Sequence, residues 1–295
     1  MSGTQFPNST AIPVYRLDGM RTVLVRAPAK LNRLEEATMT VLGYDTGPIA
    51  CETALIIDFD VDASIPIEGV VSQMDSDRRT MAARAGMRMK YMPLRFDPAT
   101  GAHQIGGRYL FDTWENMLDY MRFTSEELEL EPGIRFWERR FFSNIDRRAM
   151  RVVGAHDFKP LPTHYASRVE RFELAGDATS ENLRAAWPAL REAASRGDYA
   201  AVWLLTDSEA RQVTLLTVVT ALPGSDVTDR AASSLAALEL APSLSRYLNE
   251  SVRPRALFDR SSLNLATWLP HSDARGGDAC IFPTYPTHPL PVSIG

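Results

Sequence analysis

The chain has 295 residues, of which 45% are hydrophobic and 9% aromatic, and it carries a formal net charge of -5 at pH 7. This composition is typical of a folded globular protein, and the length suits two domains that each bury a core. No apolar run approaches the ~20 residues of a membrane helix, and the N-terminus lacks the basic start and apolar core of a secretory signal. We therefore expect a cytoplasmic protein that spans no membrane. The acidic balance also argues against nucleic acid as a partner.

Residues 1–53 predict an N-terminal extension, with two short strands between Val14 and Ala27 around a turn at Asp18 and Gly19. A first ferredoxin-like repeat is expected at 54–158. Its expected elements are a strand at 55–61, a helix at 70–85, strands at 87–96 and 104–111, a helix at 113–128 and a strand at 134–143. This order is βαββαβ.

The same order of elements recurs in different residues at 163–270, which we interpret as a second repeat. Its expected elements are a strand at 165–174, a helix at 180–196, a hairpin of 199–206 with 212–220, a helix at 228–248 interrupted at Pro242, and a strand at 255–268. Residues 271–295 are rich in proline and predict an extended C-terminal tail. The chain therefore has the pattern of a divergent tandem duplication.

A βαββαβ sheet has helices on one face only, so its other face must find a second apolar surface. Two repeats in one chain can provide that surface for each other. The sequence therefore predicts an α+β fold in which two tandem ferredoxin-like repeats pack sheet to sheet as an intrachain α/β barrel, with the helices outside.

The segment between Gly101 and Leu128 gives the strongest indication of a site. Gly106 and Gly107 permit a bulge or close backbone approach, and the aromatic strand that they begin contains Tyr109. The following helix begins near Trp114 and has apolar residues at helical spacing. Because such sheets commonly hold a small apolar molecule against their helices, this segment predicts a small-molecule site.

Arginine and aromatic residues alternate over 135–142, where Trp137 and Arg139 share one face. Either one face lines a wet or ligand-filled space, or the arginine stems pack while their heads reach the rim. A similar mixture occurs on the strand that carries Arg88 and Tyr91. These residues are therefore further candidates for a site.

Five histidines are candidates for proton transfer because imidazole titrates near neutral pH. His103 lies in the hairpin before Gly106, and His164 precedes the first strand of the second repeat; both also fit a structural role. His156, beside Asp157, favours a structural role. No pair of histidines has the i, i+4 spacing of a helical zinc site, and we expect no metal. The chain also lacks a phosphate loop, a nucleophile elbow and a dinucleotide fingerprint.

The segment Gly86–Lys90 and the strand Gly106–Phe111 with its helix resemble the dimeric α/β-barrel superfamily, which includes antibiotic-biosynthesis-type monooxygenases. The likeness covers roughly residues 54–158. It implies an oxidoreductase that acts without a cofactor on a small apolar substrate, aromatic or polyketide-like. In such chemistry a phenol or enol loses a proton, and its anion reduces oxygen.

The same resemblance implies roles for individual residues. His103 would be the catalytic base, and Arg88 or Arg139 would stabilise the anion. The residues expected to contact the substrate are Tyr91, Tyr109, Trp114, Trp137 and His164.

Two alternatives stay open. Tandem members of this fold include haem proteins such as aldoxime dehydratases, so His164 or His271 would be the axial ligand in a haem-dependent lyase or dehydratase. The chain can also be a non-catalytic protein that binds a small molecule. A homodimer is compatible with each of these functions.

Overall fold

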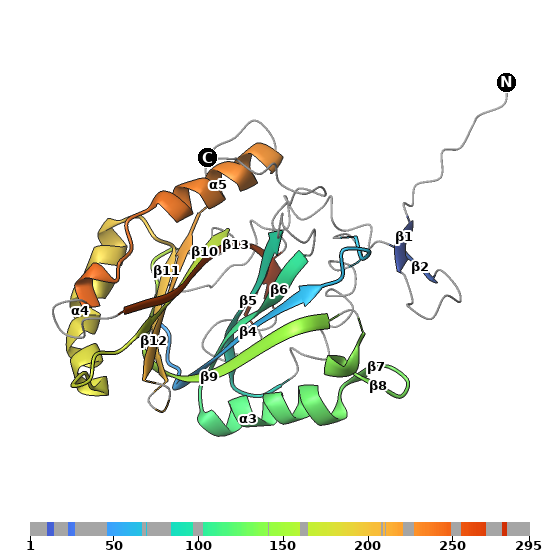
Figure 1. Ribbon diagram of the computed structural model, residues 1–295, viewed down its shortest axis with the longest axis horizontal. Helices are drawn as coiled ribbons and strands as arrows, with labels where there is room; N and C mark the ends of the chain where they lie inside the picture. Colours follow the sequence, from blue (N-terminus) through green and yellow to red (C-terminus); the bar gives the residue numbers. More distant parts are fainter. Residues whose placement is uncertain are drawn as a thin grey trace.

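Eight long strands close into one antiparallel barrel with helices on its outside, as the computed structural model shows (Figure 1). The structure describes residues 11–14, 23–26, 46–66, 69, 84–96, 103–140, 142–159, 165–207, 209, 211–220, 227–248, 255–269 and 279–281. None of the helices in these ranges is long and apolar enough to cross a membrane.

The first half of the barrel has the strand order of a ferredoxin-like unit, β9-β4-β6-β5, with antiparallel neighbours. Its strands are β4 (Thr53–Val61), β5 (Met87–Phe96), β6 (His103–Phe111) and β9 (Phe142–Asp157). Between β6 and β9 lie α3 (Trp114–Arg122), a π-helical turn (Phe123–Glu127), β7 (Glu129–Glu131), β8 (Ile134–Arg135) and a 3-10 helix (Phe136–Glu138).

The second half repeats this order as β13-β10-β12-β11. Its elements are β10 (Ala166–Glu173), α4 (Ser180–Arg196), β11 (Ala201–Asp207), β12 (Gln212–Val219), α5 (Val227–Leu240) and β13 (Arg255–Leu269). The halves join edge to edge because β5 pairs with β13 and β9 pairs with β11. The predicted α+β intrachain barrel is therefore confirmed, and hydrogen bonds join its two sheets at both edges.

Three smaller pairings complete the described sheets. The strand β3 (Gly47–Pro48) pairs with the end of β9, and β14 (Ala279–Ile281) pairs with β13. At the N-terminus β1 (Ala11–Val14) and β2 (Val23–Arg26) form a separate two-stranded sheet. β2 lies in the predicted range, whereas β1 ends where the first strand was expected to begin.

Alternation along the strands divides the core into layers. On β4, Leu55 and Ile57 point outward to the α3 layer, whereas Ala54 and Ile56 point into the barrel. The helix α3 covers one side of the barrel, and α4 and α5 cover the other (Figure 1).

The expected strand at 134–143 is wrong. That segment is the short β8 followed by a 3-10 helix, and the long strand β9 starts only at Phe142. Two other expectations are adjusted: α3 ends at Arg122 before a π-helical turn, and α5 ends at Leu240, just before Pro242. The helix expected at 70–85 lies largely outside the described residues.

Candidate functional site

Three polar side chains meet in the otherwise apolar layer between the first half of the sheet and α3. Tyr120 on α3 donates a hydrogen bond to the hydroxyl of Tyr109 on β6, with 3.2 Å between the oxygens. Lys90 is the register partner of Tyr109 on β5, and its Nζ lies 4.9 Å from the centroid of the Tyr109 ring. We call Lys90, Tyr109 and Tyr120 the lysine–tyrosine cluster.

The lysine–tyrosine cluster is shielded from solvent, with exposed fractions of 0% for Lys90, 1% for Tyr120 and 5% for Tyr109. Burial raises the pKa of Tyr109 to about 12, although the hydrogen bond from Tyr120 and the charge of Arg108 oppose the rise. Tyr109 therefore keeps its proton at neutral pH.

The two adjacent glycines of β6 explain how the cluster is positioned. A Cβ at Gly107 would lie 2.0 Å from the ring of Tyr109, so only glycine lets that ring lie over the strand. A Cβ at Gly106 would lie 1.9 Å from the carbonyl oxygen of Ile57, so glycine also allows β4 to approach. The close backbone approach expected from the sequence is therefore present at Gly106.

Arg88 and Trp114 lie near the start of α3, at the same end of the layer as Tyr109. Arg88 pairs with Asp112 at 3.4 Å, and the second oxygen of Asp112 accepts a hydrogen bond of 2.8 Å from Asn116. The guanidinium of Arg151 lies 4.1 Å from the ring of Trp114. Arg88 is thus held by Asp112 at the start of α3, at the edge of the layer between the sheet and this helix.

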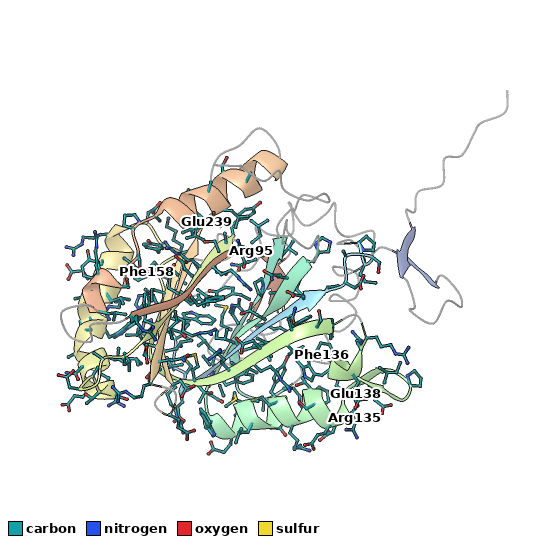
Figure 2. The ribbon with its side chains drawn as sticks, viewed as in Figure 1. Arg95, Arg135, Phe136, Glu138, Phe158 and Glu239 are labelled. Atoms are coloured by element: carbon teal, nitrogen blue, oxygen red, sulfur yellow. The ribbon has the colours of Figure 1, made fainter. Side chains whose placement is uncertain are left out.

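A second group of predicted residues lies at the opposite end of the sheet, around the 3-10 helix (Figure 2). Four rings pack together there, with centroids 4.4 to 6.1 Å apart, and we call them the aromatic box: Phe59, Phe136, Trp137 and Phe142. The buried guanidinium of Arg139 lies over two of these rings, at 5.1 and 6.0 Å. His103 belongs to the same row of the sheet, because it pairs with Val61, which pairs with Phe142.

These two groups are too far apart to share one reacting atom. His103 begins β6 and Tyr109 follows six residues later, which at ~3.3 Å per residue separates their Cα atoms by about 20 Å. Arg88 lies beyond Tyr109, next to the pairing of Met87 with Phe111. The structure therefore separates His103 from Arg88, whereas His103 and Arg139 lie at the same end.

Tyr91, one of the residues expected to contact the substrate, does not face the layer beneath α3. It is adjacent in β5 to Lys90, which faces the helices, so its own side chain points into the barrel. There it stacks on Trp203 of the second half, with centroids 5.1 Å apart. His164, His271 and His288 lie outside the described residues. His156 faces α4, and burial and the charge of Arg191 lower its pKa.

Sequence reasoning missed Lys90 and Tyr120. Lys90 is one of only three lysines in a chain rich in arginine, which was an available signal. Tyr120 stands one helical turn after Met117, on the buried face of α3, so its position was also visible. What the sequence could not give is the tertiary contact that brings the two side chains to Tyr109.

His164 and His271, the two histidines expected as possible haem ligands, lie outside the described residues. Among the residues that are described, no three metal-ligating side chains cluster. A porphyrin needs a flat apolar slot beside its axial histidine. Between β9 and α4, the ring of Trp187 packs directly on Gly154, where an added Cβ would lie only 2.2 Å from that ring. Leu183 and Leu190 of α4 are fully buried in the same layer. The residues there do not fit a porphyrin.

No family model and no curated protein matches this sequence. The solved structures that resemble it include proposed monooxygenases of Fusobacterium nucleatum (10% identity, 73% of this chain and 92% of that chain covered, TM-score 0.47) and Lactobacillus acidophilus (9%, 78% and 99%, 0.48). An anthrone oxidase-like protein (12%, 73% and 92%, 0.44) and an aldoxime dehydratase (10%, 83% and 90%, 0.29) are also similar. At these values the likeness carries no information about the reaction.

The fold follows from the pairing of the strands. Each half has the ferredoxin-like order, and the two halves close edge to edge. The chain therefore forms a closed α/β barrel of two ferredoxin-like halves within a single polypeptide.

Proposed function

We propose that the protein is a small-molecule enzyme of the cofactor-independent monooxygenase type, and that the lysine–tyrosine cluster stabilises the anion of a phenolic or enolic substrate. The observation that supports this function is a fully buried lysine beside two hydrogen-bonded phenols in an apolar layer. Acid–base groups of enzymes commonly lie in such water-excluded surroundings, where burial and neighbouring groups tune their proton affinity.

The cluster supplies the groups that this chemistry needs. In its neutral form Lys90 can accept the proton of the substrate, and as an ammonium group it then pairs with the oxyanion that it has created. Tyr109, which burial keeps protonated, donates a hydrogen bond to the same oxygen. The anion reduces molecular oxygen, so that the substrate carbon loses two hydrogens and gains one oxygen atom while the other leaves as water. Buried methionines of this layer, Met87, Met92 and Met117, exclude bulk water.

Oxygen consumption with anthrone-type and other electron-rich phenols, without added cofactor, tests the proposal. We expect Lys90→Met to lower kcat/KM about 100-fold, because it removes the base, and Tyr109→Phe to lower it about tenfold. The matched control is His103→Ala at the other end of the sheet, which should keep its activity.

Two outcomes would contradict this assignment. If His103→Ala loses activity while Lys90→Met keeps it, the reaction belongs to the end of the sheet that carries Arg139. If wild-type protein binds these phenols without consuming oxygen, the protein is a non-catalytic binder. Circular dichroism of each variant checks that it is folded.

A further inference from the structure

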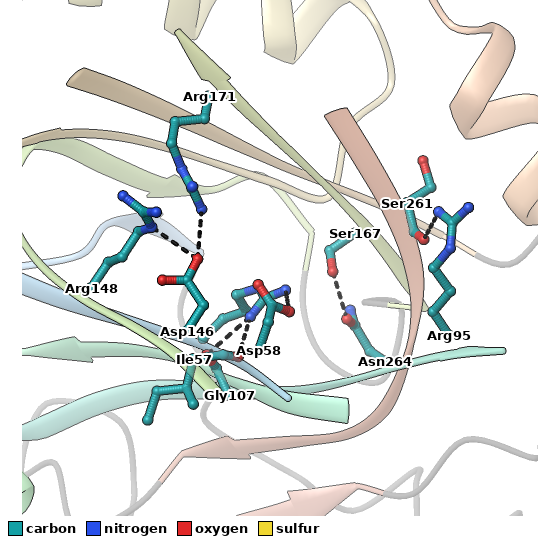
Figure 3. A network of polar contacts seen from close by, with 11 residues as sticks. Ile57, Asp58, Arg95, Gly107, Asp146, Arg148, Ser167, Arg171, Ser261 and Asn264 are labelled. Atoms are coloured by element: carbon teal, nitrogen blue, oxygen red, sulfur yellow. Dashed lines mark hydrogen bonds and ion pairs between the residues drawn. The ribbon is translucent and has the colours of Figure 1, made fainter. Parts of the chain in front are cut away.

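The inside of the barrel is apolar at one end and charged at the other. The apolar end contains the stacked Tyr91 and Trp203 and their buried neighbours. Continuing the same alternation along the strands, the charged end presents five arginines and three aspartates: Arg95, Arg108, Arg148, Arg171, Arg260, Asp58, Asp60 and Asp146. Figure 3 labels Arg95, Arg148, Arg171, Asp58 and Asp146 of this group. The lysine–tyrosine cluster lies on the outer face of the same sheet, so this end is a separate region.

The three aspartates at the charged end all have close partners. Asp58 accepts a hydrogen bond of 2.6 Å from the buried Arg108, whose other terminal nitrogen donates to the carbonyl of Ile57. Asp146 accepts a hydrogen bond of 3.0 Å from Arg148. Asp60 accepts one of 2.7 Å from Asn144.

Arg95 is also engaged. It donates to the carbonyl of Ser261 at 3.2 Å and approaches Glu239 of α5 at 3.8 Å (Figures 2 and 3). The carboxylates and this arginine therefore satisfy one another or the backbone.

Arg171 and Arg260 are less well satisfied. Arg171 is only 6% exposed, its nearest carboxylate oxygen is that of Asp146 at 3.7 Å, and its Nε has no hydrogen-bond partner in the described structure. Arg260 forms no hydrogen bond or ion pair with any described residue. Each guanidinium lies against the ring of Phe258, at 4.9 Å for Arg171 and 4.8 Å for Arg260. A cation–π contact holds each group in place but leaves its N–H donors unused.

The electrostatic surroundings agree with this geometry. Burial, and then the charge of Arg148, lower the pKa of Arg171, with only partial compensation from nearby carboxylates. Burial lowers the pKa of Arg260 as well, and the charges of Arg95 and Arg108 add to this, although the charges of Asp58 and Asp60 oppose it. Both cations would therefore be stabilised by an additional negative charge.

The charged end is open to water at its rim. The side chain of Asp146 is 42% exposed and that of Arg148 is 29% exposed. This end of the barrel therefore meets solvent at its rim, next to the more deeply buried Arg171.

We propose that the charged end of the barrel binds an oxyanion, the carboxylate or phosphate group of a small molecule, with Arg171 and Arg260 supplying the donors. Guanidinium groups bind both kinds of oxyanion through paired N–H donors. The site does not depend on the proposed monooxygenase function, because it uses other residues on the opposite face of the sheet.

Isothermal titration of the full chain with inorganic phosphate and, separately, with benzoate at fixed ionic strength tests this site. We expect saturable binding of at least one anion, weakened about tenfold in Arg171→Gln and in Arg260→Gln. The control Arg196→Gln removes the same charge from an exposed position on α4 and should bind as the wild type does. Binding of phosphate alone would identify a phosphate site, and binding of benzoate alone a carboxylate site.

A second measurement uses only wild-type protein, so it does not depend on whether the variants fold. Phenylglyoxal modifies accessible arginines, and mass spectrometry locates the modified peptides. The anion that binds should protect Arg260, which is partly exposed, and leave the exposed Arg196 reactive. Absence of saturable binding by both anions, or equal binding in wild type and the two variants, would overturn the proposal.

Discussion

At the scale of single residues, Gly106 shows how closely two strands of this barrel approach each other. The missing Cβ would lie 1.9 Å from the oxygen of Ile57 and 2.8 Å from its carbonyl carbon, both backbone atoms that no rotamer change can move. Arg108 donates to the same oxygen from the next inward position. A single added methyl group at Gly106 therefore disturbs both the pairing of β4 with β6 and the anchoring of a buried arginine.

We predict that Gly106→Ala lowers the free energy of unfolding by about 1–3 kcal/mol, the usual cost of forcing an extra methyl group into a packed region. Gly176→Ala is the matched control, because nothing lies within 4 Å of its Cβ position. Urea unfolding of both variants measures the difference. Equal stability of the two variants would show that β4 can shift at no cost.

Glu170 allows a prediction about pH. It is 4% exposed, and burial raises its pKa, while a hydrogen bond from Ser243 and the charge of Arg168 oppose the rise. The folded state therefore binds the proton more tightly than the unfolded state. The stability from this group is present below its usual pKa of 4.5 and is lost as the pH rises through the raised value.

Glu170→Gln should consequently be more stable than the wild type at pH 8, with a difference that shrinks as the pH falls below 4.5. Thermal unfolding across this range measures it. The exposed Glu181→Gln controls for the loss of one negative charge. Lower stability of Glu170→Gln at pH 8 would mean that the ion pair with Arg168, at 3.6 Å, outweighs the cost of burial.

At the scale of elements, the sequence predicted most strands but missed β9, and the reason lies in the barrel interior. The first part of β9 contains Asn144, Asp146 and Arg148, whose polarity is typical of a loop. These residues form a strand because the inside of the barrel is charged at that end. The aromatic alternation at 135–142 instead arises from a turn whose rings pack on Phe59.

The same limit applies to the candidate site. Tyr109 and Trp114 were identified because a glycine pair and a helix start are local signals. His103 and Arg88 lie at opposite ends of the paired strands β6 and β5. This separation is set by the register of the two strands, which no local sequence pattern reveals. The contact between Lys90 and Tyr109 depends on the pairing of β5 with β6, which has a bulge between Met87 and Met89.

The helix α4 begins with a capping box, in which the hydroxyl of Thr179 accepts from the backbone of Asn182 and the side chain of Asn182 accepts from the backbone of Thr179. We predict that Thr179→Ala costs about 1 kcal/mol of stability. Thr179→Ser keeps the hydroxyl and should lie within about 0.5 kcal/mol of the wild type. Chemical denaturation distinguishes them, and an unchanged Thr179→Ala would mean that packing alone holds this helix end.

At the scale of the whole molecule, the repeated order of elements was enough to predict a barrel but not how it closes. Closure depends on the register of β5 with β13 and of β9 with β11, and those strands are distant in sequence. The stacked pair of Tyr91 and Trp203 likewise joins side chains from different halves. Each half therefore relies on the other for its inner face and for both of its outer strands.

This dependence predicts a single cooperative unfolding transition for the full chain. Far-ultraviolet circular dichroism and tryptophan fluorescence should give the same midpoint in urea. Residues 46–159 and 165–269 produced separately should aggregate, because each exposes a bare apolar face and unpaired strand edges. Co-expression of the two fragments should restore a soluble complex. A soluble, folded and monomeric fragment would contradict the prediction.

The presence of both halves in one polypeptide has a consequence for stoichiometry. A barrel formed by two copies of one subunit presents every recess twice, related by a twofold axis. Here the outer layer beneath α3 holds a buried lysine and two phenols, whereas its counterpart beneath α4 is filled by leucine, alanine and tryptophan. A ligand that binds in the layer beneath α3 should therefore saturate the protein at one molecule per polypeptide.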